Sequence, residues 1–351
     1  MQFDISAKDV RFRDARTSIR RVENLFIFDV RASKIFPAVV GNDTEQDRDA
    51  LAVFGRAEWA FDPRWQLDLG LRYSREKRSI LIDGTQLLAD PLGLFAGVYH
   101  PGDILTDSVT SCLTIGICTP GEPYADSIDE GDWSGKINLL FNPNDLWRFY
   151  LSVSRGFKSG GFNDNSTSSS LQYLAVRPER LYAYEIGAKG RLSGGALHWN
   201  SAVFYYDFKN QQVEDFIVDP VFGPLEANTN APNSELYGFE SELLWQITSR
   251  LALTQGLGFT DGRFKDFQGI DSLAVSSQDR DPDFRFYSPV YLDRSDGAIG
   301  FPNWQYNGML QYQLPLVKSR WLRFAVDYSY ESEAKQAGEF ERVLPAFWLF
   351  N

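Results

Sequence analysis

Hydrophobic and polar residues alternate along this chain with a period of two. Between residues 65 and 73 every second position is Trp, Leu or Tyr, and the positions between them are Gln, Asp, Gly and Arg. A period of two is typical of a β-strand with one apolar and one polar face. The same pattern returns in the segments 147–154, 251–259 and 322–330. Each of these segments is therefore predicted to be a two-faced strand.

Less regular alternation extends this prediction over most of the chain. Further candidate strands lie at 51–61, 133–141, 182–192, 197–207, 237–247 and 304–314, with weaker ones at 19–30 and from residue 344 onward. No segment repeats its apolar residues with the period of an amphipathic helix. We predict an all-β protein with about 11–13 antiparallel strands.

The connections between these strands fall into two classes that alternate along the chain. Short turns rich in Pro, Gly, Asn, Asp and Ser are predicted at 62–64, 142–145, 193–195, 248–250 and 315–319. Long loops are predicted at 80–131, 158–178, 217–233 and 265–300. Outer-membrane β-barrels have short periplasmic turns and long extracellular loops, whereas a soluble sandwich has no reason to keep every second connection short. The pattern favours an antiparallel transmembrane β-barrel.

The polar faces of the strands carry charges that a barrel would direct into its lumen. These charges are Arg72, Lys136, Arg148, Glu185, Lys189, Glu240 and Glu242. The alternative is that they form the solvated face of a soluble antiparallel sheet. Aromatic residues near predicted strand ends favour the barrel, because a belt at the membrane interface would place them there. They are Trp65, Tyr73, Trp147 and Trp321.

The composition of the chain excludes several kinds of functional site and of binding partner. The 351 residues include 2 His and 2 Cys, too few for a His or Cys metal cluster or a thiolate redox pair, and we expect no metal, cofactor or catalytic residue. The formal net charge of −12 excludes a nucleic-acid partner, whose phosphates need a basic face. No apolar run is long enough for a transmembrane helix, but a barrel strand needs only about 9–11 residues. The N-terminal segment lacks the apolar core of a signal peptide, which indicates a cytoplasmic protein or a missing start.

In the segment 150–163, YLSVSRGFKSGGFN, a predicted strand runs directly into a glycine-rich, cationic stretch. That stretch comprises Arg155, Gly156, Phe157, Lys158, Ser159, Gly160, Gly161, Phe162 and Asn163. It resembles a motif that many TonB-dependent receptors, the outer-membrane active transporters, carry at such a strand-to-loop junction. The segments 54–78, 176–192 and 235–264 resemble further parts of the family in the same order. The resemblance covers most of residues 50–330.

The motif also has a physical interpretation of its own. Gly156, Gly160 and Gly161 suit a place where the sheet bends or another backbone approaches closely. Arg155 and Lys158 place positive charge near a membrane rim. A bulge glycine and two solvated cations fit the same residues, so we assign no substrate site to them.

The resemblance implies a fold, a location and a function. Family members are plugged β-barrels of the bacterial outer membrane, surrounded by lipid, that import a scarce small-molecule ligand such as an iron-siderophore. A TonB-type energy-transducing complex drives them through the plug. The ligand would be captured by the long loops, whose aromatic candidates are Tyr99, Tyr124, Tyr173 and Tyr287. The identity of the ligand does not follow, because the family handles siderophores, cobalamin and carbohydrates on one scaffold.

The chain also departs from the family. A complete receptor implies a plug domain before a barrel of about 22 strands, and nothing in this sequence resembles a plug. The chain ends in LPAFWLFN without the family's last hairpins. We therefore expect residues 1–351 to be a partial barrel domain without a plug, from the middle and later part of a larger barrel. The alternatives are a passive porin-like barrel and a soluble β-rich carbohydrate-binding protein.

Two cysteines lie in the longest predicted loop. Cys112 and Cys118 are separated by a few residues in the segment SCLTIGIC. A disulfide between them suits an oxidising exterior and would restrict the unfolded loop, so we expect the bridge, with two free thiols as the alternative.

Overall fold

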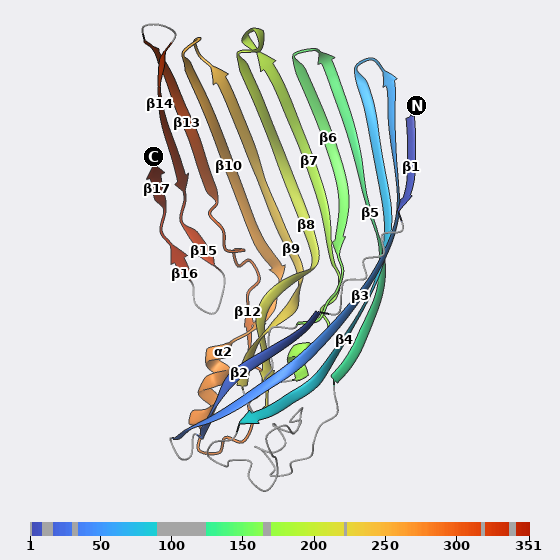
Figure 1. The fold of residues 1–351 in the computed structure, drawn as a ribbon, viewed down its shortest axis with the longest axis vertical. Helices are drawn as coiled ribbons and strands as arrows, with labels where there is room; N and C mark the ends of the chain where they lie inside the picture. The colour runs from blue at the N-terminus through green and yellow to red at the C-terminus, as the bar shows by residue number, and fades with distance from the viewer. Residues whose placement is uncertain are drawn as a thin grey trace.

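The computed structural model describes residues 2–8, 17–29, 34–89, 124–163, 170–220, 223–316, 320–336 and 342–351. Of these, only the backbone is described for 2–8, 17–29, 34–44 and 82–89 and for Tyr124, Ser170, Gln336 and Arg342. Most of these residues form one 13-stranded antiparallel sheet (Figure 1). Its strand order is β1-β3-β4-β5-β6-β7-β8-β9-β10-β13-β14-β17, with β2 also paired to β3. The predicted all-β antiparallel fold is confirmed.

Neighbouring strands of this sheet are nearly always neighbours in sequence. The strands are β1 Gln2–Lys8, β2 Thr17–Asp29, β3 Lys34–Asp62, β4 Trp65–Ala89, β5 Tyr124–Asn144, β6 Trp147–Lys158, β7 Glu179–Leu192, β8 Leu197–Asp219, β9 Gly223–Gln246, β10 Leu251–Asp266, β13 Trp304–Pro315, β14 Trp321–Glu331 and β17 Phe347–Phe350. The small ladders are β11 Gln268–Ile270 with β12 Tyr291–Asp293, and β15 Ala334–Gln336 with β16 Arg342–Leu344. The short helices are η1 Ser170–Tyr173, η2 Ser193–Gly195, α2 Ser272–Ser276 and η3 Ser277–Arg280.

Tight turns close the hairpins at one end of the sheet, which we call the short-turn end. They join β3 to β4, β5 to β6, β7 to β8 and β9 to β10, as predicted. The predicted turn at 315–319 falls between the paired strands β13 and β14, and its last three residues lie outside the described ones. Asp62 stabilises the first turn, because its carboxylate accepts the backbone N–H two residues further on at 2.9 Å. Asn144 does the same in the second turn, also at 2.9 Å. In the third turn Gly194 and Gly195 adopt φ of 64° and 94°, which glycine does without strain.

At the opposite end, which we call the long-loop end, the bounds of two predicted loops are wrong. β4 continues to Ala89 and β5 begins at Tyr124, so both flanks of the predicted loop 80–131 are strand. β8 continues to Asp219 and β9 begins at Gly223, so the described residues at both flanks of the predicted loop 217–233 are paired strand. Beyond a membrane both faces of a strand can meet water, so the alternation that marks a two-faced strand disappears there.

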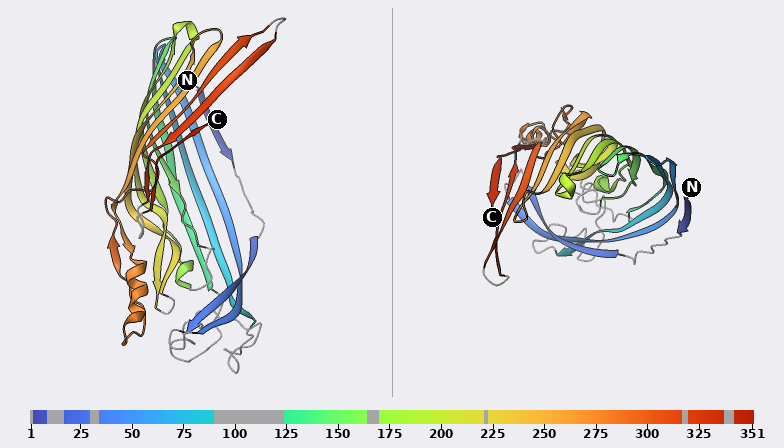
Figure 2. Two further views of the ribbon diagram at one scale, coloured as in Figure 1. Left: turned by 90° about the vertical axis from the view of Figure 1, so that its left-hand side faces the viewer. Right: turned by 90° about the horizontal axis from the view of Figure 1, so that it is seen from above.

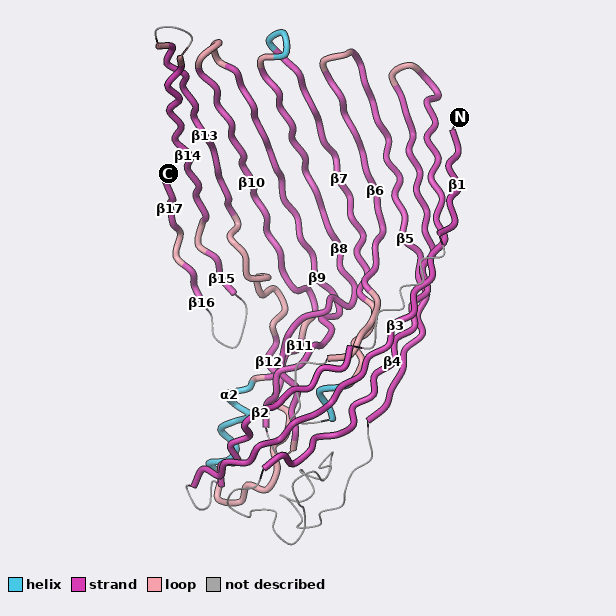
Figure 3. The backbone as a smooth tube through the Cα atoms, viewed as in Figure 1, coloured by secondary structure: helices cyan, strands magenta, loops and turns pink. Residues whose placement is uncertain are grey.

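The other two predicted loops are confirmed. β6 ends at Lys158 and β7 begins at Glu179, which agrees with the predicted loop 158–178. β10 ends at Asp266 and β13 begins at Trp304, which agrees with 265–300, although this connection contains β11, α2, η3 and β12. Figure 3 shows helical segments at the long-loop end and in one tight turn. None of the helices that the structure describes is long and apolar enough to cross a membrane.

One face of the sheet is apolar over the middle of the strands. Cross-strand partners share a face, and one such row runs through Leu67, Leu139, Leu151, Ile186, Val203, Phe239, Phe259 and Trp304. Its side chains project outward, with Ile186 59% and Val203 56% exposed. The charges predicted to face the lumen, from Arg72 to Glu242, lie on the opposite face in the same register. The apolar face is the one expected to meet lipid.

Aromatic side chains border the apolar band on both sides. Trp65 and Phe141 stack with ring centroids 4.3 Å apart towards the short-turn end, and Tyr73 and Trp133 lie 4.9 Å apart towards the long-loop end. From Trp65 to Tyr73 there are about nine residues, the length that a transmembrane strand needs. Tyr73 was expected near a strand end, but it lies inside β4, so it marks the expected membrane boundary rather than the end of the strand.

The sheet curves into an arc when it is seen from above (Figure 2). Among the described strands, no ladder joins β14 or β17 to β1. The charged face lines the inside of this arc, because a segment between β6 and β7 contacts Ile80 on that face of β4 and the Asn230 side chain on that face of β9.

Candidate functional site

The motif at residues 155–163 leaves the wall of the sheet and turns into the arc. Its first residues end β6, whereas residues 159–163, together with 170–178, form what we call the bridging segment. Gly161 and Val176 pair within this segment, and the Val176 N–H donates to the Gly161 carbonyl at 2.9 Å. The bridging segment connects the β4–β5 side of the arc to the β8–β9 side through the contacts that follow.

Two glycines let the bridging segment approach β4 and β5 closely. The Gly160 N–H donates to Glu130 Oε2 at 2.8 Å. A Cβ on Gly160 would lie 2.4 Å from the Val176 carbonyl oxygen, and one on Gly161 would lie 2.7 Å from Arg78 Nη1. Gly160 therefore excludes any side chain, which agrees with the close backbone approach predicted from the sequence, whereas at Gly161 the obstacle is the movable end of the Arg78 side chain. Gly156 differs, since a Cβ there would meet nothing within 4 Å.

Charged side chains of β3 and β4 fasten the same segment. Arg78 Nη2 donates to Ser159 Oγ at 3.1 Å, while its Nε donates to Glu76. Arg48 Nη2 also donates to Glu76, at 2.8 Å. Burial opposes ionisation of Glu76, but the hydrogen bonds from the two guanidinium groups outweigh it and lower the pKa of the Glu76 carboxyl. The carboxylate is thus ionised at neutral pH and orients Arg78 towards the segment.

Amide side chains fasten the other side of the bridging segment to β8 and β9. Gln212 Nε2 donates to the carbonyl oxygens of Ser159 at 3.0 Å and Arg177 at 3.1 Å. Asn230 binds Arg177 twice, accepting its N–H at 2.8 Å and donating to its carbonyl oxygen at 3.0 Å. Gln172 Nε2 donates to the Glu226 carbonyl at 2.8 Å. These bonds satisfy backbone groups that a loop would otherwise bury unpaired.

A small apolar cluster anchors the segment as well. Tyr173 is 5% exposed and packs with Ile80 of β4, which is 2% exposed, and with Phe162 of the motif. Asn163 beside them is also buried. The ring of Tyr173 therefore holds the bridging segment against the inner wall.

Arg155, the first motif residue, joins a cluster just outside the aromatic belt. Its guanidinium lies 2.8 Å from Asp132 Oδ1, 3.3 Å from the Tyr182 hydroxyl and within bonding distance of the Trp133 carbonyl. Arg180 Nε donates to Asp132 Oδ2 at 2.7 Å. Burial opposes ionisation of Asp132, but the bonds from Arg180 and Arg155 outweigh it and lower the pKa of its carboxyl. Arg155 therefore connects β5 to β7 at the boundary.

A buried ion pair fixes the long connection between β10 and β13. Arg294 Nη1 lies 2.9 Å from Asp215 Oδ1 on the extension of β8, and these side chains are 10% and 4% exposed. Arg294 Nη2 donates to the Ile270 carbonyl at 2.9 Å, and the guanidinium lies 5.7 Å from the centroid of the Phe267 ring. Arg294 thus attaches the connection to the neighbouring β8–β9 hairpin.

Glu235 of β9 is a second ionic centre at this end. Its carboxylate lies 2.7 Å from Arg263 Nη2, contacts Lys265 Nζ and accepts the Tyr205 hydroxyl at 2.8 Å. Burial opposes its ionisation, but the hydrogen bonds from Lys265, Tyr205 and Arg263 outweigh it and hold the pKa of Glu235 at about 2. This cluster connects the middle of β8 and of β9 to the long-loop end of β10.

The structure places the four predicted ligand-binding tyrosines differently from one another. Tyr173 lies in the buried cluster already described. Tyr287 is half-buried against Phe284, with ring centroids 4.7 Å apart, and burial followed by the charge of Asp279 raises the pKa of its phenol. Tyr99 and the side chain of Tyr124 lie outside the described residues, as do Cys112 and Cys118 with their predicted disulfide. The assignment of these residues to a ligand stays a prediction.

The sequence patterns did not identify Asp215, Glu235 and Arg294 as members of ionic clusters. Asp215 and Arg294 are far apart in the chain and sit in stretches without alternation, so no local signal connects them. Glu235 lies two residues before Tyr237 on the face that is apolar further along β9, and a charge there signals the end of the apolar band. Among the residues that the structure describes, no group of three or more His, Cys, Asp or Glu side chains is placed to hold a metal ion.

The family model for the TonB dependent receptor-like β-barrel matches residues 8–351. The pesticin receptor of Yersinia pestis is 23% identical over 206 residues, which are 57% of this chain and 24% of that protein. The pesticin receptor of Yersinia enterocolitica is 22% identical over the same shares. The chain therefore aligns with about a quarter of the length of these relatives.

Solved structures show the same fold. The ferric yersiniabactin uptake receptor FyuA from Yersinia pestis matches with a TM-score of 0.63 at 13% identity, over 90% of this chain and 40% of that chain. The siderophore receptor PiuA from Acinetobacter baumannii matches with a TM-score of 0.58 at 16% identity, over 90% of this chain and 37% of that chain. In both cases this chain covers less than half of the solved protein.

Proposed function

This chain belongs to the TonB-dependent receptor family as a β-barrel region, and from that premise we propose that it takes part in the energised import of a ferric chelate of the siderophore type. Family membership makes it an outer-membrane protein of a transport-receptor class rather than an enzyme. Its apolar face therefore contacts lipid, and the soluble alternative is excluded.

The choice of ligand class is supported by the names of similar proteins. Two of the solved receptors are named for ferric yersiniabactin uptake and for siderophores, and a third similar structure, with a TM-score of 0.53, is the copper transporter OprC. All three names concern metal ions or their chelates. We infer a ferric chelate, with the copper ion as the competing cargo in the experiment below.

The family match over residues 8–351 is the observation that carries this proposal. The geometry of the long-loop end agrees with it, because a capture site needs loops held in place by a rigid support. The bridging segment and the Arg294 ion pair supply such a support. We propose that ligand binds between the long loops above the bridging segment, with Tyr287 as the described aromatic candidate.

We also propose that the described wall is one part of a larger barrel that encloses a plug. The open arc of described strands and the 40% coverage of FyuA support this inference. The TonB-type complex would then act through the plug. Strand edges at β1 and β14 would be covered by further strands, since exposed edges invite aggregation.

Uptake of radioactive iron tests the transport proposal. The protein is expressed from its own gene in a bacterium that lacks its other iron receptors, and ferric yersiniabactin serves as the probe beside a copper salt. We expect iron accumulation that disappears when the TonB-type complex is inactivated. Equal accumulation without that complex would support the passive porin-like alternative and overturn active transport. Copper accumulation instead of iron would overturn the ligand class alone.

A matched pair of glycine variants connects the uptake to the site. Gly160→Ala pushes a methyl group against the Val176 carbonyl, whereas Gly156→Ala meets nothing within 4 Å. We expect Gly160→Ala to reduce iron accumulation at equal amounts of protein in the outer membrane, and Gly156→Ala to retain it. Equal uptake by both variants would separate the bridging segment from transport.

A further inference from the structure

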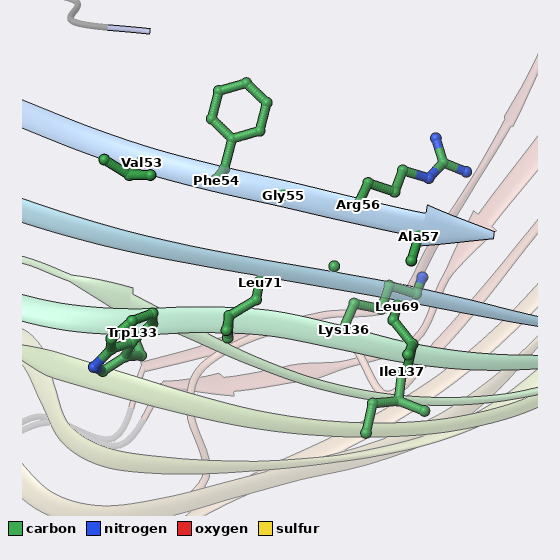
Figure 4. A pocket seen from close by; sticks show the side chains of 11 residues that line it. Val53, Phe54, Gly55, Arg56, Ala57, Leu69, Leu71, Trp133, Lys136 and Ile137 are labelled. Atoms are coloured by element: carbon green, nitrogen blue, oxygen red, sulfur yellow. The ribbon is translucent and has the colours of Figure 1, made fainter. Parts of the chain in front are cut away.

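A hollow interrupts the apolar face of the wall where β3, β4 and β5 meet. It encloses about 510 Å³ and is lined by Val53, Gly55, Leu71, Trp133 and Ile137 among others. In Figure 4, Leu71, Trp133 and Ile137 lie on one side of these strands, and Phe54 and Arg56 project to the other side. The hollow thus opens on the lipid-facing side.

The hollow arises from a missing side chain between large ones. A Cβ on Gly55 would meet nothing within 4 Å, so the floor at this position is bare backbone. Around it stand Leu71, Trp133 and Ile137, which are 57%, 52% and 55% exposed. Large side chains around a glycine that has none leave a hollow in the apolar face.

The position of the hollow determines what can fill it. Trp133 forms the long-loop-side aromatic belt with Tyr73, and Trp65 with Phe141 forms the other, so the hollow lies within the hydrocarbon layer. A buried water needs two to four polar partners, which these apolar side chains do not offer. A void without atoms would forfeit the dispersion contacts of its whole lining.

We propose that this hollow is a binding seat for one acyl chain of a membrane lipid. The chain lies over Gly55 and packs against Leu71, Trp133 and Ile137. Within a bilayer the attraction comes from close packing rather than from the hydrophobic effect, since lipid tails are as apolar as the wall. An acyl chain therefore stays bound in the hollow for a longer time than on a flat part of the wall. Such a flat part lies where Ile186 of β7 and Val203 of β8 are cross-strand partners.

The opposite face at the same place offers a matched control. Arg56 of β3 faces Gly70 of β4 across the ladder, and Gly70 also has nothing within 4 Å of an added Cβ. The hollow there encloses about 720 Å³ and includes Arg72 and Lys136 in its lining. A charged hollow of this kind does not suit an acyl chain. Leucine at Gly55 and leucine at Gly70 therefore add the same atoms to opposite faces.

Photocrosslinking with a lipid probe tests the proposal. Outer membranes that contain the protein are fused with vesicles of phosphatidylcholine carrying a diazirine on one acyl chain, irradiated and digested, and labelled residues are located by mass spectrometry. We expect Leu71, Trp133 and Ile137 to carry about three- to tenfold more label per residue than Ile186 and Val203. Gly55→Leu should remove this excess, and Gly70→Leu should retain it.

Two results would overturn the acyl-chain seat. One is equal labelling of the hollow and of the Ile186–Val203 patch in the unaltered protein, a comparison that requires no variant to fold. The other is an undiminished excess in Gly55→Leu. Both results leave iron uptake untouched, so the lipid seat and the transport proposal are tested separately.

Discussion

The membrane-spanning wall and the long-loop end of this molecule are built from the same strands but are held together differently. Between the aromatic belts, β4 and its neighbours rely on backbone ladders and on direct packing of side chains across strands. Beyond Tyr73 the same strands depend on ionic and amide side chains that join residues distant in sequence, as Arg294 joins Asp215. The interactions that hold the strands in place thus change where the surroundings change from lipid to water.

This difference has a physical reason. In hydrocarbon every backbone polar group must be paired within the sheet, which leaves little choice of structure. In water an unpaired group can be solvated, so order at the long-loop end requires specific side-chain partners. Variants at the two ends should therefore fail in different ways.

The largest effect is expected from breaking the buried ion pair. Arg294→Met leaves Asp215 buried without its partner, which costs about 3–5 kcal/mol in comparable sites. We expect this loss as faster backbone hydrogen exchange in residues 267–300, with little change between the belts. Arg280→Met removes an exposed cation of the same connection and serves as the control. Equal exchange in both variants would contradict the role of the pair.

The pH dependence of the Glu235 cluster gives a somewhat smaller effect. Its pKa of about 2 lies below the ordinary value of a glutamate, so the ionised form stabilises the fold. That contribution is complete above about pH 5 and is lost as the pH falls towards 2, and we expect it to be about 1–3 kcal/mol. Guanidinium unfolding from vesicles at several pH values measures it. Glu235→Gln should flatten the profile, and an unchanged profile would contradict the assignment.

Overpacking tests the wall itself. A Cβ on Gly187 would lie 2.4 Å from the ring of Tyr150, whose hydroxyl donates to Glu185 at 2.6 Å. Gly187→Ala should therefore destabilise the wall by about 1–3 kcal/mol. Gly70→Ala, with open space around it, should change the stability by less than about 0.5 kcal/mol. The same unfolding measurement compares the two variants. An unchanged free energy of unfolding in Gly187→Ala would show that the Tyr150 ring moves aside at no cost.

The smallest effect concerns the aromatic belt. Trp65 and Phe141 stack at 4.3 Å, and such a ring pair contributes about 0.5–1.5 kcal/mol beyond its buried area. A double-mutant cycle with Trp65→Leu and Phe141→Leu isolates that coupling. An absent coupling would mean that the belt residues act only through their contact with the membrane interface.

The wall could be predicted from the sequence almost residue by residue. Alternation placed the strand that starts at Trp65, and turn residues such as Asp62 and Asn144 placed the hairpins. The inward direction of Glu185 and Glu240 followed from the same alternation. These predictions succeeded because lipid on one side and a polar lumen on the other impose a period of two on every strand.

The long-loop end could be predicted only in part. The loop at 158–178 was placed correctly. Of the motif glycines expected at a close backbone approach, Gly160 meets the Val176 backbone, Gly161 meets the Arg78 side chain, and Gly156 meets open space. The extensions to Ala89 and Asp219 were missed because solvated strands show no alternation. The Arg294–Asp215 pair was missed because a contact between distant residues leaves no trace in a single sequence.

A nitroxide scan along residues 65–79 of β4 tests the central difference most directly. Accessibility to oxygen reports lipid, and accessibility to a water-soluble nickel chelate reports water. The account predicts that oxygen accessibility alternates with a period of two from Trp65 to Tyr73, highest at the odd positions, and that the odd positions beyond Tyr73 become accessible to the nickel chelate. Alternation that continues unchanged to Ser79, or oxygen maxima at the even positions, would contradict it.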